Sequence, residues 1–139
     1  MKTWLVDTGP LVAYLDASDP AHRQVAGTLD GFTGQLATTG AVITEAMHFV
    51  SGSTEGPGLF AEFATASDMQ VYDLCQPSEL RQAVFLMDKY ADTPMDFADA
   101  TLLLLAEGLE VEEILTLDRR GFSTYRTRTG RALRLVSGP

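Results

Sequence analysis

The stretch Thr3-Trp4-Leu5-Val6-Asp7-Thr8-Gly9-Pro10 decides how this chain begins to fold. Residues 3–6 form a short apolar run that is typical of a buried strand, and the run ends at an acid. The following Thr-Gly-Pro gives a turn, with proline placed where a helix can start. The sequence therefore predicts a strand, a turn and a helix, with the Asp7 carboxylate at the carboxyl end of the strand.

The same alternation of short apolar runs and helical spacing continues along the chain. We expect further strands at residues 35–38, 69–74, 113–117 and 133–136. We expect helices at residues 21–29, 41–50, 59–66 and 77–90, and one opened by a capping box at Thr93–Asp96 and ended by Gly108. Val42, Met47, Phe49 and Val50 are candidate core residues of the helix at 41–50. This order predicts an α/β fold, a three-layer α/β/α sandwich around a mainly parallel sheet, as a single domain over residues 1–139.

Composition is that of an ordinary globular domain. The hydrophobic fraction is 45% and the charged fraction 21%, and 139 residues suit one domain. The longest apolar run, residues 100–106, is too short to cross a bilayer, and no signal peptide is evident. The single cysteine, Cys75, is expected to be a small buried residue in a reducing compartment. We therefore expect a cytoplasmic protein that has no membrane segment.

Charge is distributed unevenly. The first 118 residues hold all nineteen acids against four basic residues, a charge of -15, whereas the stretch after Asp118 carries six arginines and no acid. A net charge of -9 argues against nonspecific coating of nucleic acid, which depends on basic residues. The asymmetry indicates either an arginine-lined surface beside an acidic centre or an arginine-rich solvated end, and the residues leave both open.

Four acids stand out by their surroundings. Asp7 and Asp118 follow strand-like runs, where open α/β sheets place their sites, although either one could simply cap a helix. Glu45 and Asp99 lie in helical stretches among apolar and small residues, although an isolated helical acid is usually solvated. Two carboxylates about 4 Å apart repel by roughly 4 kcal/mol at an effective dielectric near 20, so convergence requires a cation. All-oxygen ligation favours Mg²⁺ or Mn²⁺, and a water activated by such an ion can attack a phosphodiester.

The motifs around these acids resemble those of PIN-domain nucleases, most closely the VapC-like toxins of toxin-antitoxin pairs. The resemblance covers essentially the whole chain and rests on four strings in the family's order: residues 6–12 (VDTGPLV), 44–46 (TEA), 95–100 (MDFADA) and 114–122 (ILTLDRRGF). It implies a Mg²⁺- or Mn²⁺-dependent endoribonuclease. It also implies an RNA substrate, a cognate antitoxin and a homodimer.

Carried over by position, the resemblance also implies roles for single residues. The implied acidic quartet is Asp7, Glu45, Asp99 and Asp118, with Asp7 and Asp99 as direct metal ligands. Thr8 and Thr116 would orient these acids, and Asp96 would be either an outer ligand or a helix cap, of which we favour the cap. The family often has a further acid near position 121, where this chain has glycine. Arg119, Arg120, Arg126 and Tyr125 are candidates for contact with RNA or a partner protein.

Rival interpretations remain. His22 and His48 lack the paired spacing of a zinc helix, so packing, surface or capping roles are expected for them. A phosphatase or phospho-acceptor of the doubly wound type would need a second aspartate at position 9, where glycine stands. The motifs also allow a PIN-like module that binds RNA or protein without cutting, or an RNA-processing nuclease that is not a toxin.

Overall fold

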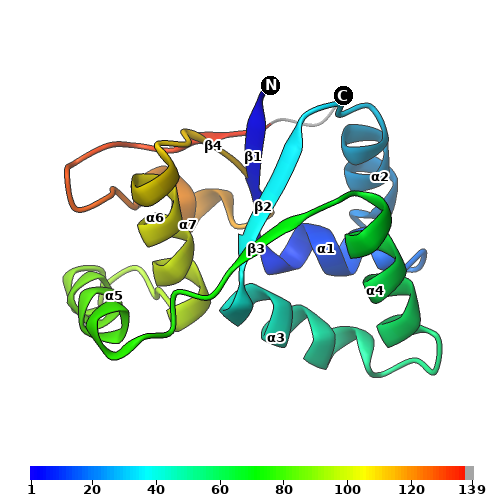
Figure 1. Cartoon of the computed structure of the whole chain (residues 1–139), viewed down its shortest axis with the longest axis horizontal. Coiled ribbons are helices and arrows are strands. Elements are labelled where there is room, and N and C mark those ends of the chain that lie inside the picture. The colour runs from blue at the N-terminus through cyan, green and yellow to red at the C-terminus, as the bar shows by residue number, and fades with distance from the viewer. Residues whose placement is uncertain (137–139) are drawn as a thin grey trace.

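A parallel sheet forms the centre of the computed structural model, which describes residues 1–136 (Figure 1). Within those residues the strands are β1 (Thr3–Val6), β2 (Gln35–Thr39), β3 (Gln70–Tyr72), β4 (Glu113–Leu115) and β5 (Arg134–Leu135). Their order is β3-β2-β1-β4-β5, and every neighbouring pair is parallel. Leu5 of β1 pairs with Ala37 of β2 on one side and with Ile114 of β4 on the other. The expected α/β fold with a parallel sheet is confirmed.

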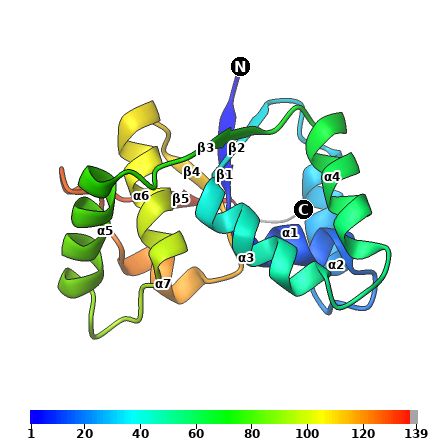
Figure 2. The same cartoon turned by 60° about the horizontal axis from the view of Figure 1, so that its bottom comes forward.

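Helices cover both faces of the sheet. In the described part of the chain they are α1 (Thr8–Leu15), α2 (His22–Asp30), α3 (Gly40–Val50), α4 (Gly56–Ala66), α5 (Pro77–Lys89), α6 (Phe97–Leu109) and α7 (Arg119–Thr124). Figure 2 shows α5, α6 and α7 on one side of the sheet and α1, α2 and α4 on the other. None of the helices in residues 1–136 has the length and apolarity that crossing a membrane requires.

Helix α6 is the central helix of its layer. All residues from Ala100 to Ala106 are buried, because this helix is apolar on every side and packs between α5 and the sheet. The acid Asp99 precedes this buried run, at the end of α6 nearest the carboxyl ends of the strands. The core therefore fixes the position of Asp99 firmly.

The strand order places a site at one edge of the sheet. The order in which the chain adds strands reverses between β1 and β4, which is the topological switch point where open α/β sheets bind ligands beyond the carboxyl ends of their strands. Asp7 follows β1 directly, and its backbone N–H donates a 3.0 Å hydrogen bond to the carbonyl of Leu115, the last residue of β4. Asp118 stands three residues beyond β4, not immediately after it as the expected strand 113–117 implied.

The ends of α6 differ from the expectation. The capping box is formed by Asp96 and Asp99, not by Thr93 and Asp96, so the helix begins at Phe97. Gly108 does not end the helix. The left-handed position is taken by Glu110 (φ 55°), and the amides of Glu110 and Val111 bond carbonyls of the last turn, which satisfies the helix end without glycine.

Two burial expectations were wrong. Cys75 is exposed, because it lies in the loop between β3 and α5 and not in a strand. Phe49 is 59% exposed, since the core-facing positions of α3 are Val42, Ala46 and Val50. The expected strand at 69–74 shortens to Gln70–Tyr72 because it pairs on one side only, with β2, at the edge of the sheet.

Candidate functional site

Asp7 is a buried carboxylate held from two directions. It is the N-cap of α1, where its Oδ1 accepts the Thr8 backbone N–H at 2.8 Å, and its Oδ2 accepts the Thr116 hydroxyl at 2.7 Å. The side chain is almost fully buried, and this burial raises the pKa of Asp7 to about 6 against the lowering effect of both hydrogen bonds. The negative charges of Asp96 and Glu45 raise it further. Ionised Asp7 therefore favours a nearby cation.

Asp99 and Asp96 cap the start of α6 reciprocally. The Asp99 backbone N–H donates to Asp96 Oδ1 at 2.8 Å, and the Asp96 backbone N–H donates to Asp99 Oδ2 at 3.1 Å. Asp96 is therefore a helix cap, the role that its spacing favours. The pKa of Asp99 is raised to about 8, first by burial and then by the negative charges of Asp96 and Asp7. Asp99 thus shares one electrostatic cluster with Asp7.

Glu45 joins the same cluster from α3. Burial raises its pKa most, the nearby Thr8 side chain lowers it, and Asp96 raises it. The Thr8 hydroxyl itself is buried and has no hydrogen bond of ordinary geometry within the described residues. The orienting group that Thr8 supplies to Asp7 is therefore its backbone amide, whereas its hydroxyl lies beside Glu45.

Asp118 lies on the β4 side and is more exposed. It is the N-cap of α7, where Oδ1 accepts the Gly121 N–H at 3.0 Å, and its own N–H donates to the Thr116 hydroxyl at 3.0 Å. Thr116 thus links Asp118 to Asp7. A Cβ at position 121 would collide with the Asp118 carboxylate, so the absence of a side chain at Gly121 allows Asp118 its present position.

Three buried threonines that the sequence did not single out brace the site. Thr38 donates to the Val6 carbonyl at 2.8 Å, which fixes the end of β1 just before Asp7. Thr39 caps α3 and bonds Thr101 of α6 at 2.8 Å, which joins the helix of Glu45 to the helix of Asp99. For Thr38 and Thr39 a signal was present in the sequence, namely polar residues at the junction of a short strand and a helix, whereas Thr101 lies inside α6 and gave no such signal.

The oxygen donors fit a hydrated divalent cation. Among residues 1–136, no three His, Cys, Asp or Glu side chains are gathered into a ready ligand set. The negative charge of Asp7 nevertheless raises the pKa of Asp99, and the buried Thr8 hydroxyl lies beside Glu45. Mg²⁺ binds through one or two carboxylates and keeps several waters, so it does not require a closed protein cage.

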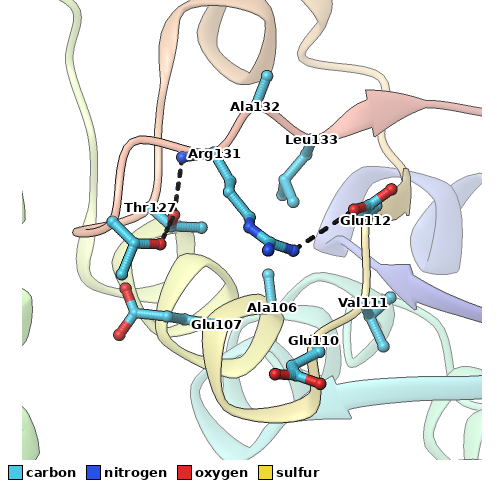
Figure 3. A pocket seen from close by; sticks show the side chains of 10 residues that line it. Ala106, Glu107, Glu110, Val111, Glu112, Thr127, Arg131, Ala132 and Leu133 are labelled. Atoms are coloured by element: carbon cyan, nitrogen blue, oxygen red, sulfur yellow. Dashed lines mark hydrogen bonds and ion pairs between the residues drawn. The ribbon is translucent and has the colours of Figure 1, made fainter.

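Most of the C-terminal arginines are engaged away from this site. Arg128 pairs with Glu107, Arg134 with Glu113 at 3.3 Å, and Arg131 with Glu112 at 3.5 Å. Figure 3 shows Arg131 lying across a hollow of about 210 Å³ at the C-terminal end of α6, the end opposite to Asp99. Three of the six C-terminal arginines are therefore paired with acids at the end of α6, in the loop that follows it and in β4.

The remaining candidates for RNA contact divide into two pairs. The Arg126 guanidinium donates to the carbonyls of Ser123, Thr124 and Tyr125, and the Tyr125 ring is fully buried with its hydroxyl on the Pro94 carbonyl at 2.6 Å. Tyr125 is therefore not exposed for stacking on a base, and the guanidinium of Arg126 is occupied by the backbone. Arg119 and Arg120 are exposed beside Asp118, and neither forms an ion pair within the described residues.

Comparison with known proteins gives consistent relatives. The chain is 33% identical over 126 residues to Ribonuclease VapC26 of Mycobacterium tuberculosis, covering 88% of this chain and 91% of that protein. No protein-family model matches the chain.

Solved structures share the fold. VapC20 of M. tuberculosis, a toxin that cleaves the sarcin-ricin loop, superposes with a TM-score of 0.75 at 16% identity, over 83% of this chain and 89% of that one. VapBC2 of Rickettsia felis, solved on a DNA fragment from its promoter, gives 0.67 at 12% identity, over 97% and 99%. A toxin-antitoxin complex from Klebsiella pneumoniae gives 0.65 at 18% identity, over 96% of each chain.

Proposed function

Because this chain belongs to the VapC family of ribonucleases, we propose that it is the toxin of a toxin-antitoxin pair and cleaves RNA internally with Mg²⁺ or Mn²⁺. The observation that supports the proposal is that the charge of Asp7, at the switch point of the sheet, helps to raise the pKa of Asp99, and that a divalent cation would offset the raised pKa of both carboxyls. Glu45, Asp96 and Thr8 complete the polar rim of this cluster.

Each side chain of the cluster has a distinct task in this proposal. Asp7 and Asp99 would hold the ion, which would supply an activated water and stabilise charge on the phosphate. Thr116 fixes the Asp7 carboxylate, and the Thr8 hydroxyl binds a water or a phosphate oxygen. Glu45, at the partly exposed side of the cluster, accepts a proton from the attacking water at its carboxylate. Asp118 orders the loop through α7 and carries Arg119 and Arg120 toward the RNA backbone.

The proposed assembly has a cognate antitoxin and a second copy of the chain. Toxin-antitoxin complexes among the structures of the same fold support the first. An apolar surface on α5, formed by Leu80, Val84 and Phe85 at 44%, 52% and 61% exposure, supports the second. We propose that the chain acts as one domain over residues 1–139, in the cytoplasm.

The test is cleavage of total cellular RNA by purified protein freed of any copurified inhibitor. We expect discrete products with Mg²⁺ or Mn²⁺ that disappear with chelator and in Asp99→Asn. Glu62→Gln, at an exposed position of α4, is the matched control and should cleave like the unaltered chain. Absence of metal-dependent cleavage would contradict the proposed ribonuclease activity. It would favour a PIN-like module that binds RNA or protein without cutting. Cleavage without growth arrest on expression would favour an RNA-processing nuclease instead of a toxin.

A further inference from the structure

A second hollow opens directly beside the acidic cluster, between α3 and the start of α6. Its volume is about 530 Å³, within the range of sites that hold small organic groups. One wall is a single face of α3, where Ala41, Thr44, Glu45 and His48 follow the helical spacing i, i+3, i+4, i+7. The facing wall is the turn that opens α6, with Phe97 at its centre.

The hollow is continuous with the candidate site. Glu45 and Asp96 line it, and Asp96 exchanges two backbone-to-carboxylate hydrogen bonds with Asp99 at the start of α6. A phosphodiester placed at an ion on Asp7 and Asp99 would therefore have this hollow next to it. A group attached to the neighbouring nucleotide is the part of the substrate that can reach it.

The lining selects a neutral flat group over a phosphate. No Lys or Arg lines the hollow, and two acids stand at its border, so a phosphate would be repelled. Ala41, Ala98 and the ring of Phe97 offer apolar and aromatic surface, of the kind on which unpaired bases stack. The charge and the apolar, aromatic lining together favour a nucleobase.

Polar groups for the edge of a base are also present. The His48 side chain is exposed, and its ring makes no hydrogen bond within residues 1–136, so both ring nitrogens can pair with a ligand. The Thr44 hydroxyl donates to the Gly40 carbonyl at 3.0 Å and keeps its acceptor capacity. These two residues stand one helical turn apart on the same wall.

We propose that the hollow between α3 and α6 binds an unpaired nucleobase of the RNA, next to the phosphate that is cut. This inference rests on the proposed ribonuclease function and adds a specificity site to it. Phe97 and Ala41 supply the surface for the ring, and His48 and Thr44 read its edge. The site selects RNA in which a base beside the scissile bond is free to leave its stack.

The test uses a short unstructured RNA that the protein cleaves at one bond, with either flanking nucleotide made abasic in turn. Removal of one flanking base should lower kcat/KM of the unaltered protein about 10-fold, because the stacking of that base on the protein is lost. Ala41→Phe, which fills the hollow from a partly exposed position, should cleave the intact RNA about 10-fold more slowly and ignore the missing base. Ala61→Phe on the exposed face of α4 is the matched control and should retain the dependence.

Two results would overturn the base site. One is an unaltered protein indifferent to both abasic substitutions, and the other is an Ala41→Phe variant with undiminished base dependence. Loss of binding to a protein partner alone in Ala41→Phe would assign the hollow to that partner.

A binding measurement separates this inference from the proposed catalysis. RNA carrying 2-aminopurine beside the site should lose fluorescence on binding the unaltered protein in chelator, but not on binding Ala41→Phe. Quenching without cleavage in the presence of any metal would support the base-binding site and contradict the proposed ribonuclease activity. Equal quenching by both proteins, or none by either, would remove the base site. Thermal unfolding of each variant confirms that it is folded.

Discussion

The hydroxyl of Thr116 donates a 2.7 Å hydrogen bond to Oδ2 of Asp7, across 109 positions of the chain. The bond joins the carboxyl ends of β1 and β4 at the switch point of the sheet. Thr116 also accepts the N–H of Asp118 at 3.0 Å, so one side chain sets the positions of two acids. The site therefore depends on the pairing of β1 with β4 in the sheet and not on any one sequence motif.

Thr116→Val keeps the shape of this side chain and removes its hydroxyl. Metal affinity and cleavage should fall by about 10- to 100-fold, as for other groups that orient a metal ligand. Thr116→Ser retains the donor and should stay near the activity of the unaltered chain. Metal titration and cleavage rates measure both effects, and equal activity of the valine variant would contradict the assigned role of Thr116.

Gly121→Ala should disturb Asp118 selectively. The added Cβ would meet only atoms of the Asp118 side chain, so the carboxylate must turn away and α7 loses its cap, a cost of about 1 kcal/mol. Cleavage should fall several-fold while the fold persists. Gly108→Ala has no atom near its new Cβ and lies inside α6, so it should raise stability by about 0.5–1 kcal/mol without affecting cleavage. Equal cleavage by the two variants would argue against a role for Asp118.

Metal-free protein should lose stability as the pH rises. Asp7 and Asp99 have folded-state pKa values of about 6 and about 8, both above the ordinary value of 3.8, so the folded state binds more protons than the unfolded state between about pH 4 and pH 8. Their contribution to stability is fully present below pH 3.8 and is lost as the pH passes through 6 and then 8.

The corresponding measurement is the Tm with chelator and with Mn²⁺ at about pH 5.5 and about pH 8.5. The gain in Tm on adding Mn²⁺ should be larger at the higher pH, because protons no longer compete for the carboxylates. In Asp99→Asn the metal-free Tm should fall less with pH and the gain should shrink. A gain that is the same at both pH values would contradict this electrostatic account.

The exposed apolar face of α5 gives a prediction for assembly. Phe85→Glu places a charge at the centre of that face and should convert a dimer into monomers in light scattering. Leu59→Glu, also at an exposed apolar position but on α4, is the control and should leave the dimer intact. A chain that is monomeric at all concentrations, or a Phe85→Glu dimer, would rule out this interface.

The strands and the acids next to them were predictable because short apolar runs and turn residues act locally. The alternation of strands and helices was sufficient to place Asp7 at the carboxyl end of β1. It could not reveal that Thr39 bonds Thr101, since that contact depends on how α3 and α6 pack. Nor could it separate Arg119 from Arg128, because the pairing of Arg128 with Glu107 forms only when the C-terminal loop folds back on α6.

Helix ends were the least predictable feature for a related reason. Thr93 and Asp96 have the spacing of a capping box in the sequence. The box forms three residues later, between Asp96 and Asp99, where the Asp99 carboxylate accepts the Asp96 backbone N–H. Gly108 looked like a stop signal, but α6 continues one residue past it to Leu109, and Glu110 takes the left-handed cap position.

Diffraction at the manganese absorption edge from crystals soaked in Mn²⁺ would locate the bound ion. We expect an anomalous peak within ligand distance of the carboxylates of Asp7 and Asp99, absent from Asp99→Asn crystals treated identically. A peak held by other residues, or none in crystals of protein that cleaves RNA with Mn²⁺, would contradict the assignment of these acids as the metal site.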